Sequence, residues 1–447
     1  MKTNLLSTLV LVAACALTTT RGAAEIADST YASVNLTAAG SLSTVLKAQG
    51  YDLAKIKRIV VSGKINSRDF NTLGKTMVNL TDIDLSGTDA TIIPDETFKD
   101  RQQLQTIKVP EALHKIGTSA FNNCYQLTSF NFTANLDTVG DNAFNYCNAL
   151  KDSIRFSEKL SYLGYAAFSN CMALKQVDLS ASTKLTTIGG MAFYYCTQLT
   201  SVLLPPSINY LEWGTFYYCS ALVEMDLSGC TSLVGLNGGD TFAECRSLKR
   251  ITLPPSLSSI GSEFRGCSAL ESFTMLASTP PTTSTTTFGD IPLSTCTLYV
   301  PFGSEEAYFN APNWYFESII GVGLRPSIGA HGLLKADGAF MANGKVLFNQ
   351  QQAVLFEAIP EPGYEVDQFL VNGSAVQLTN NQYQLPAGVN SATIEVRFKV
   401  KQFLLSIQTE GQGVLVHKGQ VLQTPVVLEV DSATSASFVV RPEAGFV

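Results

Sequence analysis

The chain contains few charged side chains and very little histidine. Asp, Glu, Lys and Arg make up 15% of its 447 residues and only 3 residues are histidines, whereas charged residues form about 25% of an average globular protein. The formal net charge is −7, and this mild acidic excess argues against nucleic acid as a partner. With 45% hydrophobic residues the chain is too apolar to be disordered. Its length exceeds that of one ordinary domain of about 100 to 200 residues.

Motifs of the common catalytic and metal sites are also absent. The sequence has no G-x-S-x-G, H-E-x-x-H, P-loop or EF-hand pattern, and no C-x2-C pair of the kind that zinc sites use. The histidines stand far apart, at His114, His331 and His417. The carboxylate pairs, Asp82 with Asp84 and Glu224 with Asp226, lie on one face of expected strands, which is typical of a solvated sheet surface. The sequence therefore predicts a protein without enzymatic activity, cofactor or metal.

Residues 1–24 have the layout of a secretory signal peptide, in which Lys2 precedes an apolar run from Leu5 to Leu17. The run is shorter than the about 20 apolar residues of a spanning helix. Two processing schemes stay open: residues 14–16 (A-C-A) fit a cleavage site, whereas residues 12–15 (V-A-A-C) resemble a bacterial lipobox in which Cys15 would carry a lipid. No later segment reaches spanning length without charges, so we expect an exported protein without a transmembrane span and with a possible lipid anchor.

A phenylalanine recurs every 22 to 26 residues through the middle of the chain. A cysteine follows three residues after each phenylalanine except the first, and a leucine follows three residues later. The phenylalanines are Phe98, Phe121, Phe144, Phe168, Phe193, Phe216, Phe242 and Phe264, and the cysteines are Cys124, Cys147, Cys171, Cys196, Cys219, Cys245 and Cys267. The unit reads I-G-x-x-A-F-x-x-C-x-x-L, then an alternating segment and a Pro-containing turn. Periods of this length indicate a solenoid.

One copy of the unit cannot fold alone. About five inward apolar side chains contribute roughly 2 kcal/mol each, whereas ordering about 23 residues costs at least about 23 kcal/mol. We therefore expect an α/β solenoid in which stacked coils stabilise one another. Alternation after each cysteine predicts strands that form a parallel β-sheet. The glycine, as at Gly117, predicts a sharp turn, and the A-F-x-x-C spacing predicts a short helical turn. Glu212 and Asn237 replace this glycine, so we expect irregular coils around Trp213 and Asn237.

The repeat resembles that of the BspA-like leucine-rich repeat family of bacterial surface proteins. Residues 59–73 and 79–98 also resemble the first turns of such arrays, and residues 278–319 resemble their terminal segment. The resemblance covers about residues 55–322, which leaves residues 25–54 as an N-terminal cap region and residues 323–330 as a linker. It implies a leucine-rich-repeat array and, for function, export, surface display and adhesion to host or neighbouring-cell molecules.

One cysteine at a fixed position of each coil could bind metal, form disulfides or pack. Disulfides between rungs about 5 Å apart would require side chains turned toward one another, and 7 cysteines cannot all pair. We predict a structural ladder of buried thiols that pack as small apolar side chains and donate weak hydrogen bonds to the backbone. Cys230 and Cys296 lie outside this ladder.

Two sets of surface residues are candidate ligand contacts. One is the exposed column of the expected sheet, where Arg155, Asp178 and Asp226 stand among residues of mixed charge and size. The other is a stripe of aromatic residues in the middle coils: Tyr194, Tyr195, Tyr210, Trp213, Tyr217 and Tyr218. Tyrosine and tryptophan are common in binding hot spots and stack on sugars. The alternative is that these rings pack on the outside of the short helical segments.

After residue 323 the repeat gives way to two copies of a small β module. Residues 338–347 match residues 413–422, and residues 356–364 match residues 438–446. Alternating apolar residues predict antiparallel strands, and Val371-Asn372-Gly373 is a hairpin signal. We assign residues 331–400 to module 1 and residues 401–447 to module 2; both resemble bacterial β repeats that serve as stalks. Module 2 ends before its closing strands, so we expect it to be incomplete.

These patterns and the resemblance together predict a secreted or cell-surface binding protein, adhesin-like and non-catalytic, whose solenoid recognises host or neighbouring-cell proteins. The alternative is a glycan-binding accessory protein of an outer-membrane nutrient-uptake system. In both cases the partner is an extracellular protein or glycan, and the expected location is extracellular or the outer-membrane surface.

Overall fold

The computed structural model describes residues 29–151, 153–236, 238–343, 353–389, 391–408, 410, 413–423, 425–431 and 436–442. The chain divides into two compact units, Met1–Leu174 and Lys175–Val447. The predicted signal peptide, with Cys15, and the predicted irregularity at Asn237 lie outside the described residues. Within those residues, no helix combines the length and the apolar character needed to cross a membrane.

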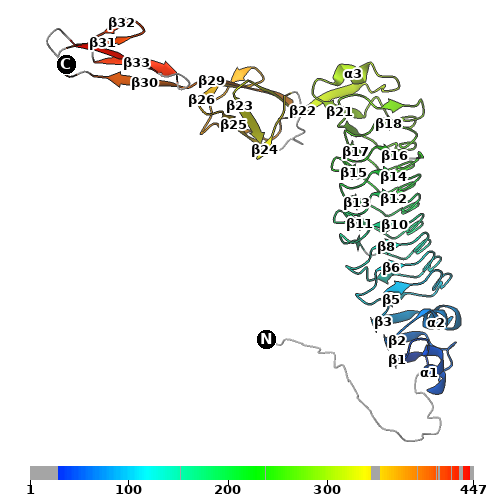
Figure 1. Cartoon of the computed structure of the whole chain (residues 1–447). Helices are drawn as coiled ribbons and strands as arrows, with labels where there is room; N and C mark the ends of the chain where they lie inside the picture. The colour runs from blue at the N-terminus through cyan, green and yellow to red at the C-terminus, as the bar shows by residue number, and fades with distance from the viewer. Residues whose placement is uncertain are drawn as a thin grey trace, which may run out of the picture. The chain divides into compact units, whose positions relative to one another are not determined.

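The first unit contains two parallel sheets (Figure 1). The first sheet has the order β1 (Tyr31–Leu36), β2 (Arg58–Gly63), β3 (Asp82–Thr88), β5 (Thr106–Lys108) and β7 (Ser129–Phe130). The second joins β4 (Ile92–Ile93), β6 (Lys115–Ile116), β8 (Thr138–Val139) and β10 (Tyr162–Leu163). The remaining elements are α1 (Leu42–Ala48), α2 (Ser67–Asn71), the π-helix η1 (Thr72–Thr76) and β9 (Ile154–Arg155). The I-G dipeptides therefore supply a second sheet, where the sequence predicted only one.

The second unit repeats this arrangement (Figure 1). Strands of the first-sheet type are β11 (Gln176–Asp178), β13 (Ser201–Leu203), β15 (Glu224–Asp226), β17 (Arg250–Leu253), β19 (Ser272–Met275) and β21 (Thr297–Pro301). Strands of the second type are β12 (Thr187–Ile188), β14 (Tyr210–Leu211), β16 (Gly235–Leu236), β18 (Ser259–Ile260) and β20 (Thr282–Thr283). All their pairings are parallel, as in β17 with β19, where Ile251 lies opposite Phe273. The predicted parallel sheet is confirmed.

The A-F-x-x-C segments are successive tight turns, and the helical turns predicted from their spacing are wrong. In one coil, Ser119 and Asn123 have φ values of 55° and 65°, a left-handed backbone that interrupts a right-handed helix. The Phe121 N–H consequently donates to the Ala143 carbonyl of the next coil at 2.8 Å, and the Asn123 N–H donates to the Asn145 carbonyl at 2.8 Å. A helix would use these N–H groups within its own turns. Hydrogen bonds between neighbouring coils therefore take the place of the hydrogen bonds of a helix.

The glycine of the I-G dipeptide is needed for close packing between coils. A side-chain carbon on Gly117 would lie 2.6 Å from the backbone nitrogen of Asp95, and one on Gly164 would lie 2.6 Å from that of Asp141. Neither glycine has a left-handed φ, so the sharp turn inferred from sequence is not the reason for glycine here. Any side chain would push neighbouring coils apart.

The repeat phenylalanines form a stacked column inside each unit. In the first unit, the ring centroids of Phe121 and Phe144 are 5.1 Å apart with 8° between the ring planes. In the second, Phe216 stacks on Phe193 at 5.6 Å and on Phe242 at 5.6 Å. All of these rings are fully buried. Each phenylalanine thus contributes both apolar burial and ring contacts to the interface between neighbouring coils.

Beyond the coils, α3 (Glu305–Phe309) precedes β22 (Ser318–Ile328), a strand that includes most of the predicted linker. Module 1 contains β23 (Gly332–Ala336), β24 (Ala339–Phe340), β25 (Val354–Pro360), β26 (Tyr364–Val371), β27 (Ser374–Ala375), β28 (Gln382–Leu385) and β29 (Ser391–Val400). Strand β22 pairs with both β21 and β29, and buried and exposed side chains alternate over residues 324–327. Asn372 and Gly373 have φ values of 50° and 76°, so the predicted hairpin is confirmed.

Module 2 contains two small antiparallel sheets. One joins β30 (Gln402–Ile407) to β33 (Val426–Asp431), and the other has the order β32 (Gln420–Leu422), β31 (Gly413–His417) and β34 (Val439–Pro442). Apolar side chains such as Leu404 and Val440 are exposed there. Of the predicted match between residues 338–347 and 413–422, the first segment contains β24 and the second the β31–β32 hairpin. Residues 344–347 lie outside the described residues.

Candidate functional site

Four tyrosines from two neighbouring coils stack on the turn segments of the second unit. The ring centroids of Tyr194 and Tyr217 are 5.1 Å apart with 12° between the planes, and those of Tyr195 and Tyr218 are 4.3 Å apart with 3°. Tyr194 and Tyr195 also contact each other, at 5.0 Å. All four side chains are half-buried, so part of each ring faces solvent. We call these four residues the tyrosine cluster.

Two tyrosines of the cluster occupy strained backbone positions. Tyr195 and Tyr218 both have a φ of 59°. Every other coil with a ladder cysteine also has a positive φ at this repeat position, which holds Asn123, Tyr146, Asn170, Glu244 and Gly266. Asparagine and glycine adopt this conformation easily, whereas another residue loses about 1 kcal/mol or more. Packing of the coils therefore does not favour tyrosine at this position. A role at the surface would explain the choice, because strained residues concentrate at functional sites.

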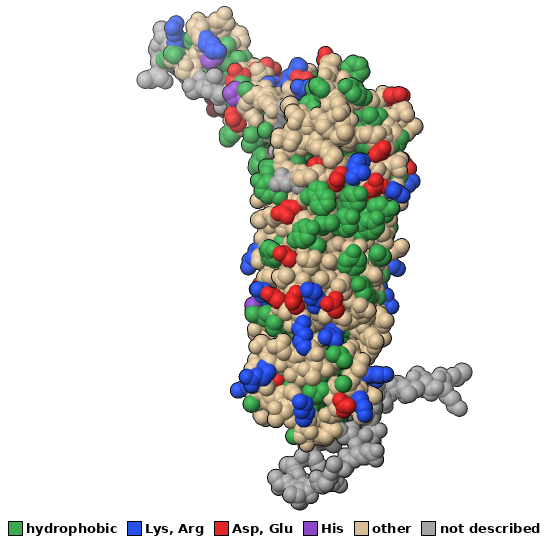
Figure 2. All heavy atoms as spheres, turned by 90° about the vertical axis from the view of Figure 1, so that its right-hand side faces the viewer, with side chains coloured by type: hydrophobic (Ala, Val, Ile, Leu, Met, Phe, Trp, Pro, Cys, Tyr) green, Lys and Arg blue, Asp and Glu red, His purple; other side chains and the backbone are tan. Residues whose placement is uncertain are grey.

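Two arginines border the tyrosine cluster. The guanidinium carbon of Arg246 lies 5.2 Å from the ring centroid of Tyr218, and that of Arg265 lies 6.0 Å from the ring centroid of Tyr217. Both distances are within the range of cation–π attraction. Figure 2 shows a group of hydrophobic side chains, a class that includes tyrosine there, with acidic and basic side chains beside it.

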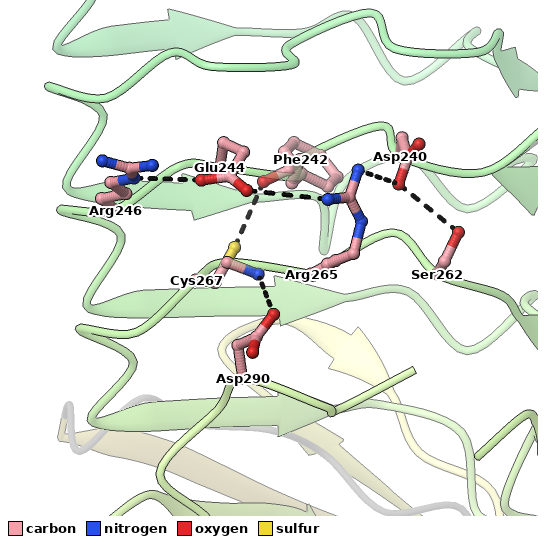
Figure 3. Close-up of polar contacts among 9 residues, drawn as sticks. Asp240, Phe242, Glu244, Arg246, Ser262, Arg265, Cys267 and Asp290 are labelled. Atoms are coloured by element: carbon pink, nitrogen blue, oxygen red, sulfur yellow. Dashed lines mark hydrogen bonds and ion pairs between the residues drawn. The ribbon is translucent and has the colours of Figure 1, made fainter. Parts of the chain in front are cut away.

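Acidic side chains fix the positions of these arginines (Figure 3). The Nε of Arg246 donates to Glu244 at 3.0 Å, and this hydrogen bond raises the pKa of Arg246 further. Arg265 lies between two carboxylates, 3.3 Å from Asp240 and 3.7 Å from Glu244. The border is therefore a charged network with fixed geometry. It can meet hydrogen-bond donors and acceptors of a partner beside the apolar rings.

The other predicted aromatic residues lie on a different side of the coils. Tyr210 is in β14, on the second sheet, with an exposed fraction of 38%, and Trp213, two residues beyond that strand, is 42% exposed. The predicted stripe of six aromatics is thus divided between two sides. Tyr194, Tyr195, Tyr217 and Tyr218 are brought together on the outside of the turn segments. Whether these rings contact a ligand or only pack on those segments stays a prediction.

The charged candidates lie on the first-sheet strands. Asp178 and Asp226 each accept a backbone N–H two residues later, from Ser180 at 3.0 Å and from Ser228 at 2.8 Å. These bonds form Asx turns that end the strands, which gives both aspartates a structural role. Arg155 is exposed in β9 of the first unit.

The structure places all seven ladder cysteines in the core, each with an exposed fraction of 0%. The Sγ of Cys124 contacts the Phe98 carbonyl at 3.1 Å, and that of Cys267 contacts the Phe242 carbonyl at 3.2 Å. Burial raises the pKa of both thiols to about 12. Each thiol therefore stays protonated and serves as a donor to the preceding coil.

In the part of the chain that the structure describes, no group of three His, Cys, Asp or Glu side chains is arranged to hold a metal ion. Sequence reasoning also missed the charged border, namely Asp240, Glu244, Arg246 and Arg265. These residues are not aromatic and so did not extend the predicted stripe. Their position in the repeat was a usable signal, because Glu244 and Arg265 occupy the two positions between phenylalanine and cysteine that hold tyrosine in the preceding coils.

The repeat is similar to repeats of known proteins. A family model described as the BspA type leucine rich repeat region matches residues 25–151, 63–185, 126–237 and 237–304. Similar solved structures include a leucine rich repeat protein of T. pallidum, with 22% identity, 43% of this chain and 77% of that chain covered, and a TM-score of 0.32. The pneumococcal vaccine antigen PcpA has 18% identity, coverage of 61% and 69%, and a TM-score of 0.35.

A leucine rich cell surface protein of Faecalibacterium prausnitzii has 17% identity, coverage of 53% of this chain and 77% of that chain, and a TM-score of 0.27. No curated protein matches the chain.

Proposed function

Since this chain belongs to the BspA-type leucine-rich repeat family, we propose that it is a non-catalytic, adhesin-like protein that acts outside the cell or on the outer-membrane surface. Leucine-rich repeat proteins are typically binding scaffolds, whose stacked coils present an extended surface. The proposed partner is an extracellular protein of a host or a neighbouring cell.

The tyrosine cluster with its charged border is the proposed contact surface. The observation that carries this proposal is the strained backbone of Tyr195 and Tyr218, because the fold would be satisfied by asparagine at both positions. Rigid aromatic rings beside arginine are the composition of protein-binding hot spots. The border of Glu244, Arg246 and Arg265 adds polar contacts around the rings.

A double variant, Tyr195→Asn with Tyr218→Asn, tests this surface. Asparagine suits the left-handed backbone, so the variant should be at least as stable as the wild type. Its binding to a panel of immobilised extracellular-matrix proteins should fall at least about tenfold, or about 1.4 kcal/mol. Tyr210→Ser, on the second sheet, is the matched control and should bind normally. Unchanged binding by the folded double variant would refute the assignment.

The alternative function is glycan binding in a nutrient-uptake system. Testing the same variants on a glycan array distinguishes it from protein binding. Stacked tyrosine faces also suit sugar rings. Binding to glycans alone, lost in the double variant, would assign the tyrosine cluster to this alternative.

A further inference from the structure

A carboxyl group occupies a core position where the other coils have alanine or threonine. The residue before the repeat phenylalanine is alanine in four coils: Ala120, Ala143, Ala167 and Ala192. In the coil of Phe264 it is Glu263, whose exposed fraction is 2%. Alanine would fill the position at no electrostatic cost, whereas a buried carboxylate is costly unless it is paired.

The described residues include two buried carboxyl groups, those of Asp69 and Glu263. The two differ in their hydrogen bonds. Asp69 accepts hydrogen bonds from the backbone N–H groups of Gly40, Leu42 and Asn66. In Glu263, by contrast, the buried Oε2 has no hydrogen-bond partner among the described residues. Five other buried side-chain atoms also lack a partner among the described residues, and one of them is Oγ1 of Thr241 at the same repeat position. Because buried polar atoms of native proteins are nearly always paired, the oxygen of Glu263, the only carboxyl in this set, is open to a partner from outside the chain.

The carboxyl group faces a hollow of about 430 Å³ beside β16, β18 and β20. Four of its lining residues are glycines: Gly235, Gly238, Gly239 and Gly261. A side-chain carbon on Gly261 would lie 3.2 Å from Oε2 and 3.3 Å from Oε1 of Glu263. Glycine therefore places no side chain against the carboxyl group on this side. The volume is within the about 300 to 1,000 Å³ of small-molecule sites.

The rest of the lining offers hydrogen-bond acceptors. Ser259, Thr282, Thr283 and Ser284 supply hydroxyl groups, and none of the described lining residues is Lys, Arg or His. The hydroxyl of Ser284 already bonds to Thr286 and Thr287. The hydroxyls of Thr282 and Thr283 already donate to the carbonyls of Ser258 and Pro312, at 3.3 and 3.0 Å. Their oxygens can still accept. A ligand that brings hydrogen-bond donors, with positive charge near Glu263, matches these groups.

We propose that this hollow binds an amino sugar whose free ammonium group pairs with Glu263 and whose hydroxyl groups donate to the serine and threonine oxygens. A hexosamine supplies both kinds of donor on one ring, and several hydroxyl oxygens lie around a single carboxyl. A lysine side chain would pair with the carboxyl group but would bring no hydroxyl groups to the serine and threonine oxygens. The site shares no residue with the tyrosine cluster, so the two proposals can fail separately.

The site should respond to pH in a defined way. Burial raises the pKa of Glu263 to about 7; the nearby carboxylate of Asp240 raises it further, and the backbone N–H groups of Glu263 and Gly261 lower it. The ammonium group binds the ionised carboxylate. Because the ionised fraction falls from about one half at pH 7 to about one hundredth at pH 5, affinity should fall about fiftyfold between these pH values.

Calorimetric titration of the whole chain with glucosamine at pH 7 tests the proposal. We expect binding by the wild type, and at least about tenfold weaker binding by Glu263→Gln and by Gly261→Ala. Glucose and N-acetylglucosamine lack the ammonium group, so they should bind the wild type at least about tenfold more weakly than glucosamine does. The Tyr195→Asn with Tyr218→Asn variant should bind glucosamine as the wild type does, which separates this site from the tyrosine cluster.

Three results would overturn the proposal. The first is no binding of millimolar glucosamine by the wild type, and the second is equal binding by the folded Glu263→Gln variant. The third is binding of a lysine amide as tightly as glucosamine, which would show that the hydroxyl groups contribute nothing and that the ligand is a peptide amine. Glu263→Ala, with the residue that other coils use, provides a folded variant if Glu263→Gln is unstable.

Discussion

The buried carboxyl of Glu263 should make the stability of the second unit depend on pH. Burial raises its pKa from 4.5 to about 7 in the folded chain. A pKa difference of one between the folded and the unfolded chain corresponds to about 1.4 kcal/mol of stability. The difference of about 2.5 units corresponds to about 3 kcal/mol. Because the folded pKa is the higher one, this stability is fully present below pH 4.5. It is lost as pH rises to about 7 and changes no further above that value.

The change to test is Glu263→Gln, which removes the titrating group and keeps the shape. Urea unfolding followed by tryptophan fluorescence, which reports on the second unit through Trp213 and Trp314, measures its stability between pH 4.5 and 8. The wild type should lose about 3 kcal/mol relative to the variant across this range. Glu271→Gln, on an exposed side chain paired with Lys249, is the control and should show no comparable dependence on pH. A constant difference between wild type and Glu263→Gln would refute the reasoning.

Two further predictions concern the core. Phe216→Ala should lower the free energy of unfolding by about 3 to 5 kcal/mol, because Phe216 is fully buried between two stacked rings; a loss below about 1 kcal/mol in denaturant unfolding would contradict the stacked column. The 9 cysteines of the described residues are buried and free, and they should react with a thiol reagent only after unfolding, since burial raises the pKa of Cys124 and Cys267 to about 12. Rapid labelling of these nine in the native chain, or no free thiols after unfolding, would argue against this.

Much of the fold could be predicted because the repeat is strong. Phenylalanine, cysteine and leucine at fixed positions define which side chains face inward, and a unit too small to fold alone must stack. The parallel sheet and the hairpin at Asn372-Gly373 follow from such local patterns. The turn segments were predicted wrongly, because a spacing of three residues suits both a helix and a turn. Backbone hydrogen bonds to the next coil decide between them.

The sequence predicted the tyrosines of the candidate site but not its charged border. The tyrosines stood out by type, but the left-handed backbone of Tyr195 and Tyr218 depends on how each coil docks on its neighbour. The position of Arg265 between Asp240 and Glu244 likewise joins side chains of neighbouring coils.

The sequence by itself determined the period, the inward face of each coil and the membership of the repeat family, because these depend on residue types at fixed spacing. Only the tertiary structure decided which surface residues meet, that a second sheet exists, and that a hollow lined in part by glycines lies beside Glu263. The physical reason is that such features arise between coils. Residues more than twenty positions apart come into contact there, and the geometry of the intervening turns sets their distance.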